Sequence, residues 1–285
     1  MLKASDVAAT TDLASPAAAA RGANRRRWDR MPVYRLLLLA VMLGAWFGLV
    51  RRGVLDPFFF GDPLRVAGVI WMWLSTGVIL PHLATTLAET LLAFVFGSVG
   101  GIASGLLLGL NEGAARLLDP FIKGANATPR VVLAPIFALW FGLGIWSKVA
   151  LGTTLVFFVV FFNVFQGVRE VSPTVLANIR MLGASRGELL RHVYFPSATS
   201  WVFSSLHNAI GMAFVGSVIG EYLGSVRGVG FLILQAEGTF DVNAVFAGIV
   251  VLTAAALVLD MAVSRLEQRL LVWRPTAGQT EREPS

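Results

Sequence analysis

The side chains that most often carry out enzyme chemistry are sparse in this 285-residue sequence. It contains no cysteine and three histidines, His82, His192 and His207. The absence of cysteine excludes disulfide bonds, thiolate metal ligands and cysteine nucleophiles. The histidines are far apart, and no acidic pair joins them at the spacing of a metal site or of a general acid and base. The sequence therefore predicts neither a catalytic cluster nor a metal site.

The lysines bear on whether the chain could hydrolyse ATP. A phosphate-binding loop of the Walker type needs a lysine that follows glycine and precedes serine or threonine. The lysines are Lys3, Lys123 and Lys148, and none of them follows a glycine. We therefore expect no ATP hydrolysis through such a loop, so any ATP-driven work requires a partner protein.

Ionisable residues inside apolar stretches are the next candidates, because a charge within a membrane is costly and is often functional. Glu89 lies about seven residues into the apolar stretch 82–110, close enough to its end for hydration, so structural and functional roles are both open. The stretch 120–143 is interrupted by Pro129, Arg130 and Pro135. Broken helices in membranes occur where they line a cavity or are buried in protein, which indicates a translocation pathway.

Arg130 is the strongest single charge within these apolar stretches. Facing a cavity, it would favour anions; alternatively it snorkels, or pairs with Glu112 or Asp119. The complete set of candidate pathway residues is Glu89, Asn126, Pro129, Arg130, Pro135 and Glu221.

The overall composition is that of a membrane protein. Hydrophobic residues make up 56% of the sequence and charged residues 14%, with a mean hydropathy of +0.71, whereas soluble domains contain about 25% charged residues. The net charge of +6 does not indicate a nucleic-acid partner, because the basic residues sit at the ends of apolar segments, where they orient helices.

We expect an all-α membrane protein with about six transmembrane helices. A short aromatic stretch, 66–80, is expected to lie on the outer membrane surface as an interfacial helix. A single permease domain is expected over 34–274, between a disordered N-terminal tail, 1–33, and a C-terminal tail, 275–285. The arginines before the first span resemble those of an export signal, but the run ends in Arg51-Arg52 rather than at a small-residue cleavage site. The expected spans are 36–50, 82–110, 120–143, 148–168, 199–223 and 243–263.

The distribution of basic residues predicts the orientation in the membrane. Under this topology Arg51, Arg52, Arg65, Lys148 and Arg227 fall on one side, and sixteen other lysines and arginines fall on the opposite side. Because cytoplasmic segments carry the excess of basic residues, both termini and the loop 170–197 are predicted to be cytosolic.

Two expected spans carry glycines at every fourth position. Such spacing lets helix backbones approach closely, either within one bundle or between two copies of it. These helix-packing glycines are Gly97, Gly101, Gly105 and Gly109 in one span, and Gly216, Gly220 and Gly224 in another.

The loop 170–197 is too polar to cross a membrane and is predicted to form two short helices, 173–182 and 186–194. Ser185 and Glu188 have the spacing of a capping box. Val175, Ile179 and Leu182 form an apolar stripe on the first helix. The stripe either docks into a groove of another protein or packs back on the membrane helices.

The second half of this loop reads as a glycine (Gly183), nine residues, an aliphatic residue, any residue, a hydrophobic residue and a proline (Pro196). This pattern resembles the cytosolic loop signature of binding-protein-dependent ABC importer permeases. Further segments in the same order extend the resemblance over residues 80–274, and they look like the nitrate, sulfonate and taurine branch. These segments are NATPRVVLAPIFALWFGLGIWSK at 126–148, GEYLGSVRGVGFLI at 220–233 and LEQRLLVW at 266–273.

The resemblance implies a homodimeric, type I ABC importer-like permease of the bacterial inner membrane. It implies two copies of a cytosolic ATPase subunit that bind the ATP and Mg, and an extracytoplasmic substrate-binding protein. The substrate would be a small solute, an organic or inorganic anion such as sulfonate, taurine or nitrate. An ion-coupled carrier or channel is the alternative, and a membrane enzyme fits less well. The implied residues for coupling to the ATPase subunit are Val175, Ala177, Ile179, Arg180, Leu182, Gly183, Ala184, Ser185, Glu188 and Pro196.

The loop departs from the family pattern at two positions. Ala177 stands where the family usually has a glutamate, and Ile179 where it usually has an alanine, whereas Arg180 is kept. The departure implies that docking here relies on the apolar stripe and on Arg180.

Overall fold

The computed structural model describes residues 31–270, apart from some side chains between residues 173 and 270. The chain divides into two compact units, residues 1–63 and 64–285. The tail expected at 1–33 lies outside the described residues, except that residues 31–33 already belong to a helix, and the tail expected at 275–285 lies outside them entirely.

The described part of the first unit contains α2 (Met31–Arg51) and α3 (Pro57–Phe60). Asp56 caps α3, because its side chain accepts a hydrogen bond of 2.9 Å from the backbone N–H of Phe58. The indole of Trp46 in α2 donates to the carbonyl oxygen of Phe60 across 3.2 Å. Nearly all apolar side chains of α2 are exposed, as expected for a helix that faces lipid.

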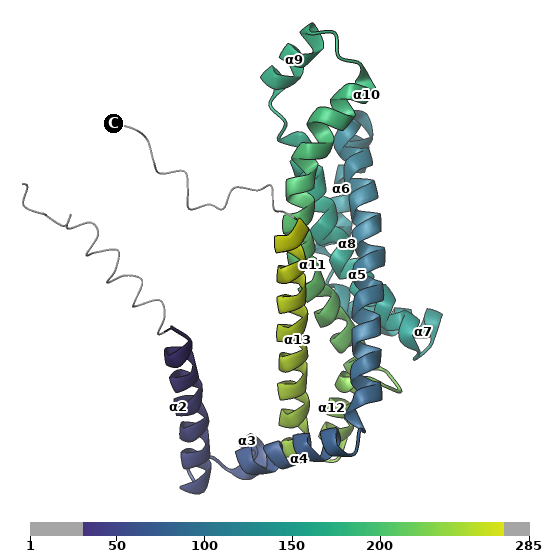
Figure 1. The fold of residues 1–285 in the computed structure, drawn as a ribbon. Coiled ribbons are helices and arrows are strands. Elements are labelled where there is room, and N and C mark those ends of the chain that lie inside the picture. Colours follow the sequence, from purple (N-terminus) through teal and green to yellow (C-terminus); the bar gives the residue numbers. More distant parts are fainter. Residues whose placement is uncertain (1–30, 271–285) are drawn as a thin grey trace, which may run out of the picture. The chain divides into compact units, whose positions relative to one another are not determined.

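The second unit is a helical bundle (Figure 1). Its helices are α4 (Pro63–Ser75), α5 (Ile79–Leu110), α6 (Glu112–Ala127), α7 (Ala134–Phe141), α8 (Ile145–Arg169), α9 (Pro173–Met181), α10 (Arg186–Leu189), α11 (Phe195–Leu223), α12 (Val229–Gly238) and α13 (Val242–Leu270), with the 3₁₀ turn η1 (Arg130–Leu133) and the π-helical turn η2 (Leu190–Tyr194). Figure 1 shows α9 and α10 at one end of this bundle, and α4 and α12 at the opposite end.

The prediction of an all-α membrane protein is confirmed, although the described residues contain five rather than six continuous helices that are long and apolar enough to cross a membrane. These are Met31–Arg51, Ile79–Leu110, Ile145–Arg169, Trp201–Leu223 and Val242–Glu267. The expected span 120–143 is instead divided among α6, η1 and α7. The break lies at Thr128, whose backbone is extended (ψ 127°), because the following Pro129 disfavours helical conformation at the residue before it.

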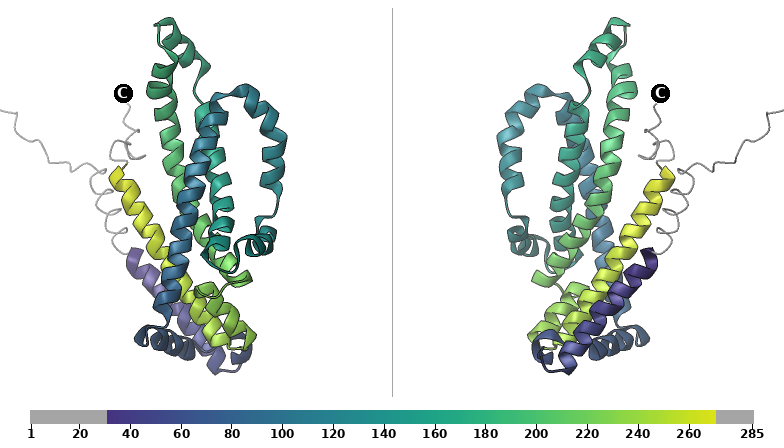
Figure 2. Two further views of the ribbon diagram at one scale, coloured as in Figure 1. Left: turned by 90° about the vertical axis from the view of Figure 1, so that its right-hand side faces the viewer. Right: turned by 90° about the vertical axis from the view of Figure 1, so that its left-hand side faces the viewer.

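The polar stretch 111–119, between the expected spans 82–110 and 120–143, forms the first turns of α6 and its cap. The Asn111 side chain caps the helix by accepting from the backbone N–H of Ala114 across 3.1 Å. Ion pairs at the i, i+4 spacing follow, Glu112 with Arg116 and Asp119 with Lys123. Both views of Figure 2 show α6 set apart from α5, α8 and α11, and Ala115 is its one buried residue.

The glycines of α5 bring this helix into direct contact with α8. A Cβ atom added at Gly97, Gly101, Gly105 or Gly109 would lie 2.5–2.9 Å from the Cβ atom of a valine on α8. The facing valines are Val156, Val160, Val164 and Val168, one for each glycine in the same order. The four-residue periods of the two helices therefore match, and this interface lies within one chain.

The glycines of α11 make the second close approach of the core. A Cβ at Gly216 would lie 2.6 Å from the Cα of Gly152 on α8, and one at Gly220 would lie 2.9 Å from Cγ of Lys148. Gly224, at the end of α11, faces Leu143 instead. The buried core between these helices consists of Ala93, Val156, Val160, Val164, Ala209 and Ala213. Helices α5, α8 and α11 thus form the tightly packed body from which the loops and the remaining helices extend.

Candidate functional site

The loop between α8 and α11 contains helices at both predicted places, α9 and α10. The second helix, expected over 186–194, is α-helical only over Arg186–Leu189 and continues through η2 into α11. They are separated at Gly183, whose φ of +85° is a left-handed conformation that side chains with a Cβ rarely adopt. The capping box is confirmed: the backbone N–H of Ser185 donates to Oε2 of Glu188 across 2.7 Å, and the backbone N–H of Glu188 donates to Oγ of Ser185 across 3.3 Å. The hydrogen bond from the Ser185 N–H lowers the pKa of Glu188 from its ordinary value.

The apolar stripe of α9 projects from this loop. Val175 is 45% exposed and Leu182, directly after the helix, is 86% exposed, whereas Ile179 is half-buried. Ala177 is exposed and Ala184 half-buried. Arg180 lies in α9 and Pro196 in α11, but their side chains lie outside the described part of the chain.

At the opposite end of the bundle, three ionisable side chains from three helices meet in a buried polar cluster. Glu89 on α5, Lys148 on α8 and Glu221 on α11 have exposed fractions of 1%, 0% and 0%. Glu89 and Glu221 interact electrostatically with each other, and the ammonium group of Lys148 interacts electrostatically with both. Lys148 also donates to the carbonyl oxygens of Leu143 (2.6 Å) and Gly144 (3.0 Å). The opposite charge and these hydrogen bonds offset part of the cost of burial, whereas Oε2 of Glu89 has no hydrogen-bond partner.

The N-terminus of α12 completes this cluster. The backbone N–H of Gly230 donates to Oε2 of Glu221 across 2.7 Å, and Thr86 donates its hydroxyl to Oε1 of the same carboxylate across 2.6 Å. The backbone N–H of Val229 donates to the hydroxyl oxygen of Thr86, and the backbone N–H of Gly228 donates to Nδ1 of His82. Side chains from α5 and α11 therefore satisfy the amide groups of α12 that have no partner within their own helix. A Cβ at Gly228 would overlap the Glu221 carboxylate, so glycine is required at this position.

The remaining pathway candidates lie around the break between α6 and α7. Asn126, Pro129 and Pro135 are exposed. Arg130 donates to the side-chain and backbone oxygens of Asn126, and its guanidinium group lies over the ring of Phe158 at 4.6 Å. The hypothesis that Arg130 pairs with Glu112 or Asp119 is wrong, because those acids pair with Arg116 and Lys123 within α6.

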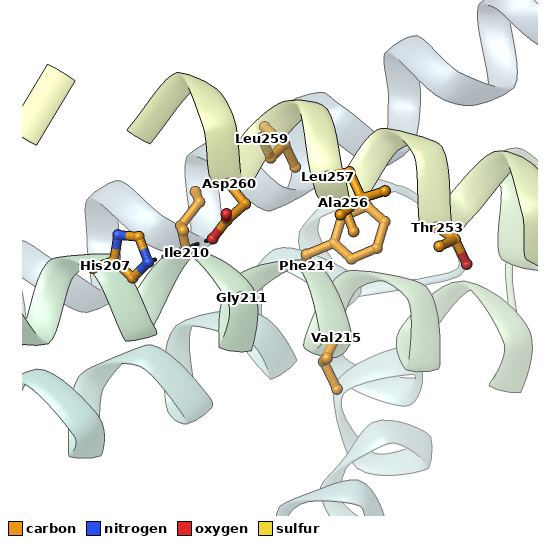
Figure 3. Close-up of a pocket in the computed structure, with 10 residues that line it drawn as sticks. All are labelled: His207, Ile210, Gly211, Phe214, Val215, Thr253, Ala256, Leu257, Leu259 and Asp260. Carbon is orange, nitrogen blue, oxygen red and sulfur yellow. Dashed lines mark ion pairs between the residues drawn. The ribbon is translucent and has the colours of Figure 1, made fainter. Parts of the chain in front are cut away.

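A lateral cavity of about 330 Å³ lies between α11 and α13 (Figure 3). Most of its lining is apolar, but one end carries His207 and Asp260, whose Nε2 and Oδ1 atoms are 3.4 Å apart. Nδ1 of His207 also lies 3.3 Å from Oε2 of Glu267. The residues that line the lateral cavity are His207, Ile210, Gly211, Phe214, Val215, Thr253, Ala256, Leu257, Leu259 and Asp260.

Sequence reasoning missed several of these residues. Lys148 was assigned to the outer surface as a topology signal, but it is fully buried. The structure brings Glu89 and Glu221 together with Lys148, whereas Arg130 lies apart with Asn126 and Phe158. A lysine in the first turn of an apolar helix was the available signal for the cluster. Nothing in the sequence indicated the approach of His207 to Asp260. Among the described residues, no group of three or more acidic or histidine side chains could hold a metal ion.

Comparison with known proteins identifies the family. Residues 97–272 match the family described as binding-protein-dependent transport system inner membrane component. The chain is 30% identical over 239 residues to the putative aliphatic sulfonates transport permease protein SsuC of Bacillus subtilis (strain 168), covering 84% of this chain and 87% of the relative. It is also 30% identical over 237 residues to the formylaminopyrimidine transport permease protein ThiX of Halalkalibacterium halodurans, covering 83% of this chain and 94% of the relative.

A solved structure agrees in fold. An inward-facing structure of the MetNI methionine ABC transporter superposes with a TM-score of 0.58 at 19% identity, covering 67% of this chain and 95% of that chain. Together with the helical bundle and its spanning helices, these matches show that the chain is a member of the binding-protein-dependent transport system inner membrane component family, the permease subunits of ABC importers, whose ATPase activity lies in a separate subunit.

Proposed function

We propose that this permease works as a homodimer with two copies of an ATPase subunit that bind ATP and Mg, and that it imports a small organic anion of the sulfonate class. Both termini and the loop 170–197 face the cytosol in this proposal, and an extracytoplasmic binding protein delivers the substrate on the opposite side. A single permease domain over 34–274 carries the transport.

The observation that carries the proposal is the exposed apolar stripe of α9. In a loop that only faces water, side chains as apolar and as exposed as Val175 and Leu182 would contribute nothing to stability, so their exposure indicates a contact surface. An amphipathic helix that presents such a stripe is suited to a groove on another protein. In this family the ATPase subunit is the cytosolic partner for such a contact, and Arg180 on the same helix would add a charged contact.

The structure of the loop suits it to transmit motion. The chain continues from α10 through η2 into α11 without a flexible connection. Leu189 of α10 is buried, and Ser197 near the start of α11 donates to the carbonyl oxygen of Gly167 on α8 across 3.1 Å. Displacement of α9 by a closing ATPase dimer would therefore move α11, and rigid-body motion of helices is a common basis of alternating access.

The substrate class rests on two supports. SsuC, a relative at 30% identity, is named for aliphatic sulfonates, and taurine is a sulfonate of the expected size. Arg130, Asn126, Pro129 and Pro135 lie at the break between α6 and α7, where non-helical backbone is compatible with a pathway. ThiX has the same identity to this chain, so a pyrimidine is the comparison substrate in the test below.

The coupling role is tested by charge substitution on α9. We expect Leu182→Asp and Ile179→Asp to abolish ATP-dependent uptake and to weaken co-purification of the ATPase subunit, because a carboxylate cannot enter an apolar groove without losing its hydration. Gly183→Pro should act similarly, because proline fixes φ near −65° and this position needs +85°. The measurement is uptake in proteoliposomes together with the amount of bound ATPase subunit.

The matched control is Ala177→Glu, which adds a carboxylate to the same helix outside the stripe, at the position where the family usually has glutamate. It should insert, bind the ATPase subunit and transport normally. Normal uptake by both stripe variants would contradict the coupling role.

The substrate class is tested by competition during uptake of labelled taurine. Taurine uptake that excess formylaminopyrimidine does not inhibit would support the sulfonate class. Uptake of formylaminopyrimidine without uptake of taurine would reject it. Uptake by the permease alone under an ion gradient would instead support a secondary carrier.

A further inference from the structure

The lateral cavity between α11 and α13 has the form of a trough with one polar end. Figure 3 shows His207 and Asp260 at that end and Thr253 toward the other, with Phe214 between them. From residue 207 to 215 along α11 the trough extends roughly 12 Å at the helical rise. Its volume of about 330 Å³ is at the lower end of the range for small-ligand pockets, about 300–1,000 Å³.

The polar end has an excess of negative charge. A single histidine, His207, faces two carboxylates, those of Asp260 and Glu267. Even a protonated His207 would balance only one of them. The Asp260 side chain is 61% exposed, so its carboxylate can accept further hydrogen bonds. This end of the trough is therefore complementary to a cationic hydrogen-bond donor.

The apolar part of the trough faces outward from the bundle. Val215 is 46% exposed and Leu257 is 59% exposed, and both lie within helices that can span a membrane. The space beside Gly211 in the trough is empty, because a Cβ at this position would have no atom within 4 Å. In a bilayer, the exposed apolar part of this trough, which runs along two spanning helices, is covered by lipid hydrocarbon.

We propose that the lateral cavity binds a membrane phospholipid with a primary ammonium head group. One acyl segment lies along Phe214, Val215 and Leu257, and the ammonium group donates to Asp260. In the orientation of the proposed function, α11 runs outward from the cytosolic side and α13 returns to it, so the polar end lies in the cytosolic half of the membrane. The lipid comes from the cytosolic leaflet. The site rests on that orientation but not on the identity of the transported solute.

Lipid retention by the purified full-length protein tests the proposal. Phosphatidylethanolamine, phosphatidylcholine and phosphatidylglycerol with identical acyl chains differ in charge and in hydrogen-bond donors, and native mass spectrometry counts the retained molecules. We expect phosphatidylethanolamine to be retained about fivefold more than phosphatidylcholine, because its ammonium group donates a hydrogen bond to Asp260 whereas the quaternary ammonium of choline has no N–H, and a net hydrogen bond contributes about 1 kcal/mol. Asp260→Asn should remove this preference, because it removes the charge with little change in volume.

Two further variants separate the trough from general effects. Gly211→Leu should lower retention of all three lipids by filling that empty space in the trough. Glu112→Gln removes an exposed carboxylate on α6 and should change nothing. The chain has no cysteine, so a disulfide in the Val215→Cys variant could form only between two copies of the chain that meet at this face. We expect no such cross-link.

Equal retention of the three lipids, or an unchanged preference in Asp260→Asn, would overturn the proposal. So would efficient cross-linking of Val215→Cys, or displacement of the lipid by taurine, because either result would assign the trough to another occupant. None of these measurements depends on transport, so the lipid site and the proposed function fail separately.

Discussion

Thr86 on α5 donates its hydroxyl hydrogen to Glu221 on α11 across 2.6 Å, and its oxygen accepts the backbone N–H of Val229 at the start of α12 across 3.0 Å. One buried hydroxyl thus links three helices. The contact explains how a carboxylate is accommodated in the membrane-spanning part of the fold, and it gives the first prediction.

Replacing Thr86 by valine should lower stability, because the substitution keeps the shape and leaves both Glu221 Oε1 and the Val229 N–H without this partner. A buried polar group left unsatisfied costs about 1–3 kcal/mol. Thermal unfolding of the purified protein is the measurement. Thr85→Val is the neighbouring control, because Thr85 donates only to the carbonyl oxygen of Pro81 in its own helix. Equal melting temperatures for the two variants would reject the role of Thr86.

Lys148→Met should be more damaging, because it removes the cation that faces Glu89 and Glu221. Removing a buried cation leaves the carboxyl groups that it faces without their compensating charge, which costs on the order of 3 kcal/mol. The surface variant Lys123→Met, whose pair with Asp119 is largely exposed, should change stability little. A double-mutant cycle with Glu221→Gln measures the coupling, and additive effects of the two substitutions would show that Lys148 and Glu221 do not interact.

Two adjacent glycines of α5 should respond oppositely to alanine. At Gly101 a Cβ would lie 2.8 Å from the carbonyl oxygen of Phe157, so Gly101→Ala must push α5 from α8, at about 1–3 kcal/mol. At Gly100 the nearest atom, on the Phe157 ring, would lie at 3.4 Å. Gly100→Ala should therefore be neutral, or stabilising by up to about 1 kcal/mol through helix propensity. Unfolding measurements on both variants in one detergent compare them directly, and a reversed order would show that this interface differs from the structure.

The capping box at Ser185 and Glu188 predicts a pH dependence of the loop. The hydrogen bond from the Ser185 N–H lowers the pKa of Glu188 below 4.5. A carboxylate with a lowered pKa stabilises the fold above its unfolded-state pKa, and this contribution is lost as the pH falls through the lowered value. Hydrogen exchange of the Ser185 amide should therefore stay protected at neutral pH and lose protection under acidic conditions. In Glu188→Gln the acid-dependent loss should disappear; its persistence would assign it to another group.

Much of the local structure follows from sequence because it depends on neighbours within a few residues. The capping box, the separation of α9 and α10 at Gly183 and the break at Pro129 all arise from backbone constraints of single residues. The apolar runs identified the spanning helices, although their ends shifted by several residues and the run 120–143 is divided among α6, η1 and α7. The glycine periods predicted close packing but left its partner open.

The tertiary structure alone decided which residues far apart in the chain meet. It paired the glycines of α5 with valines of α8. It also brought Lys148 within electrostatic range of Glu89 and Glu221, although a lysine at the start of an apolar helix is equally compatible with the membrane surface. It also placed His207 beside Asp260 and Glu267. Hydropathy and capping act along one helix and are legible in the sequence. Contacts between helices depend on rotation and register, which are set by the packing of the whole bundle.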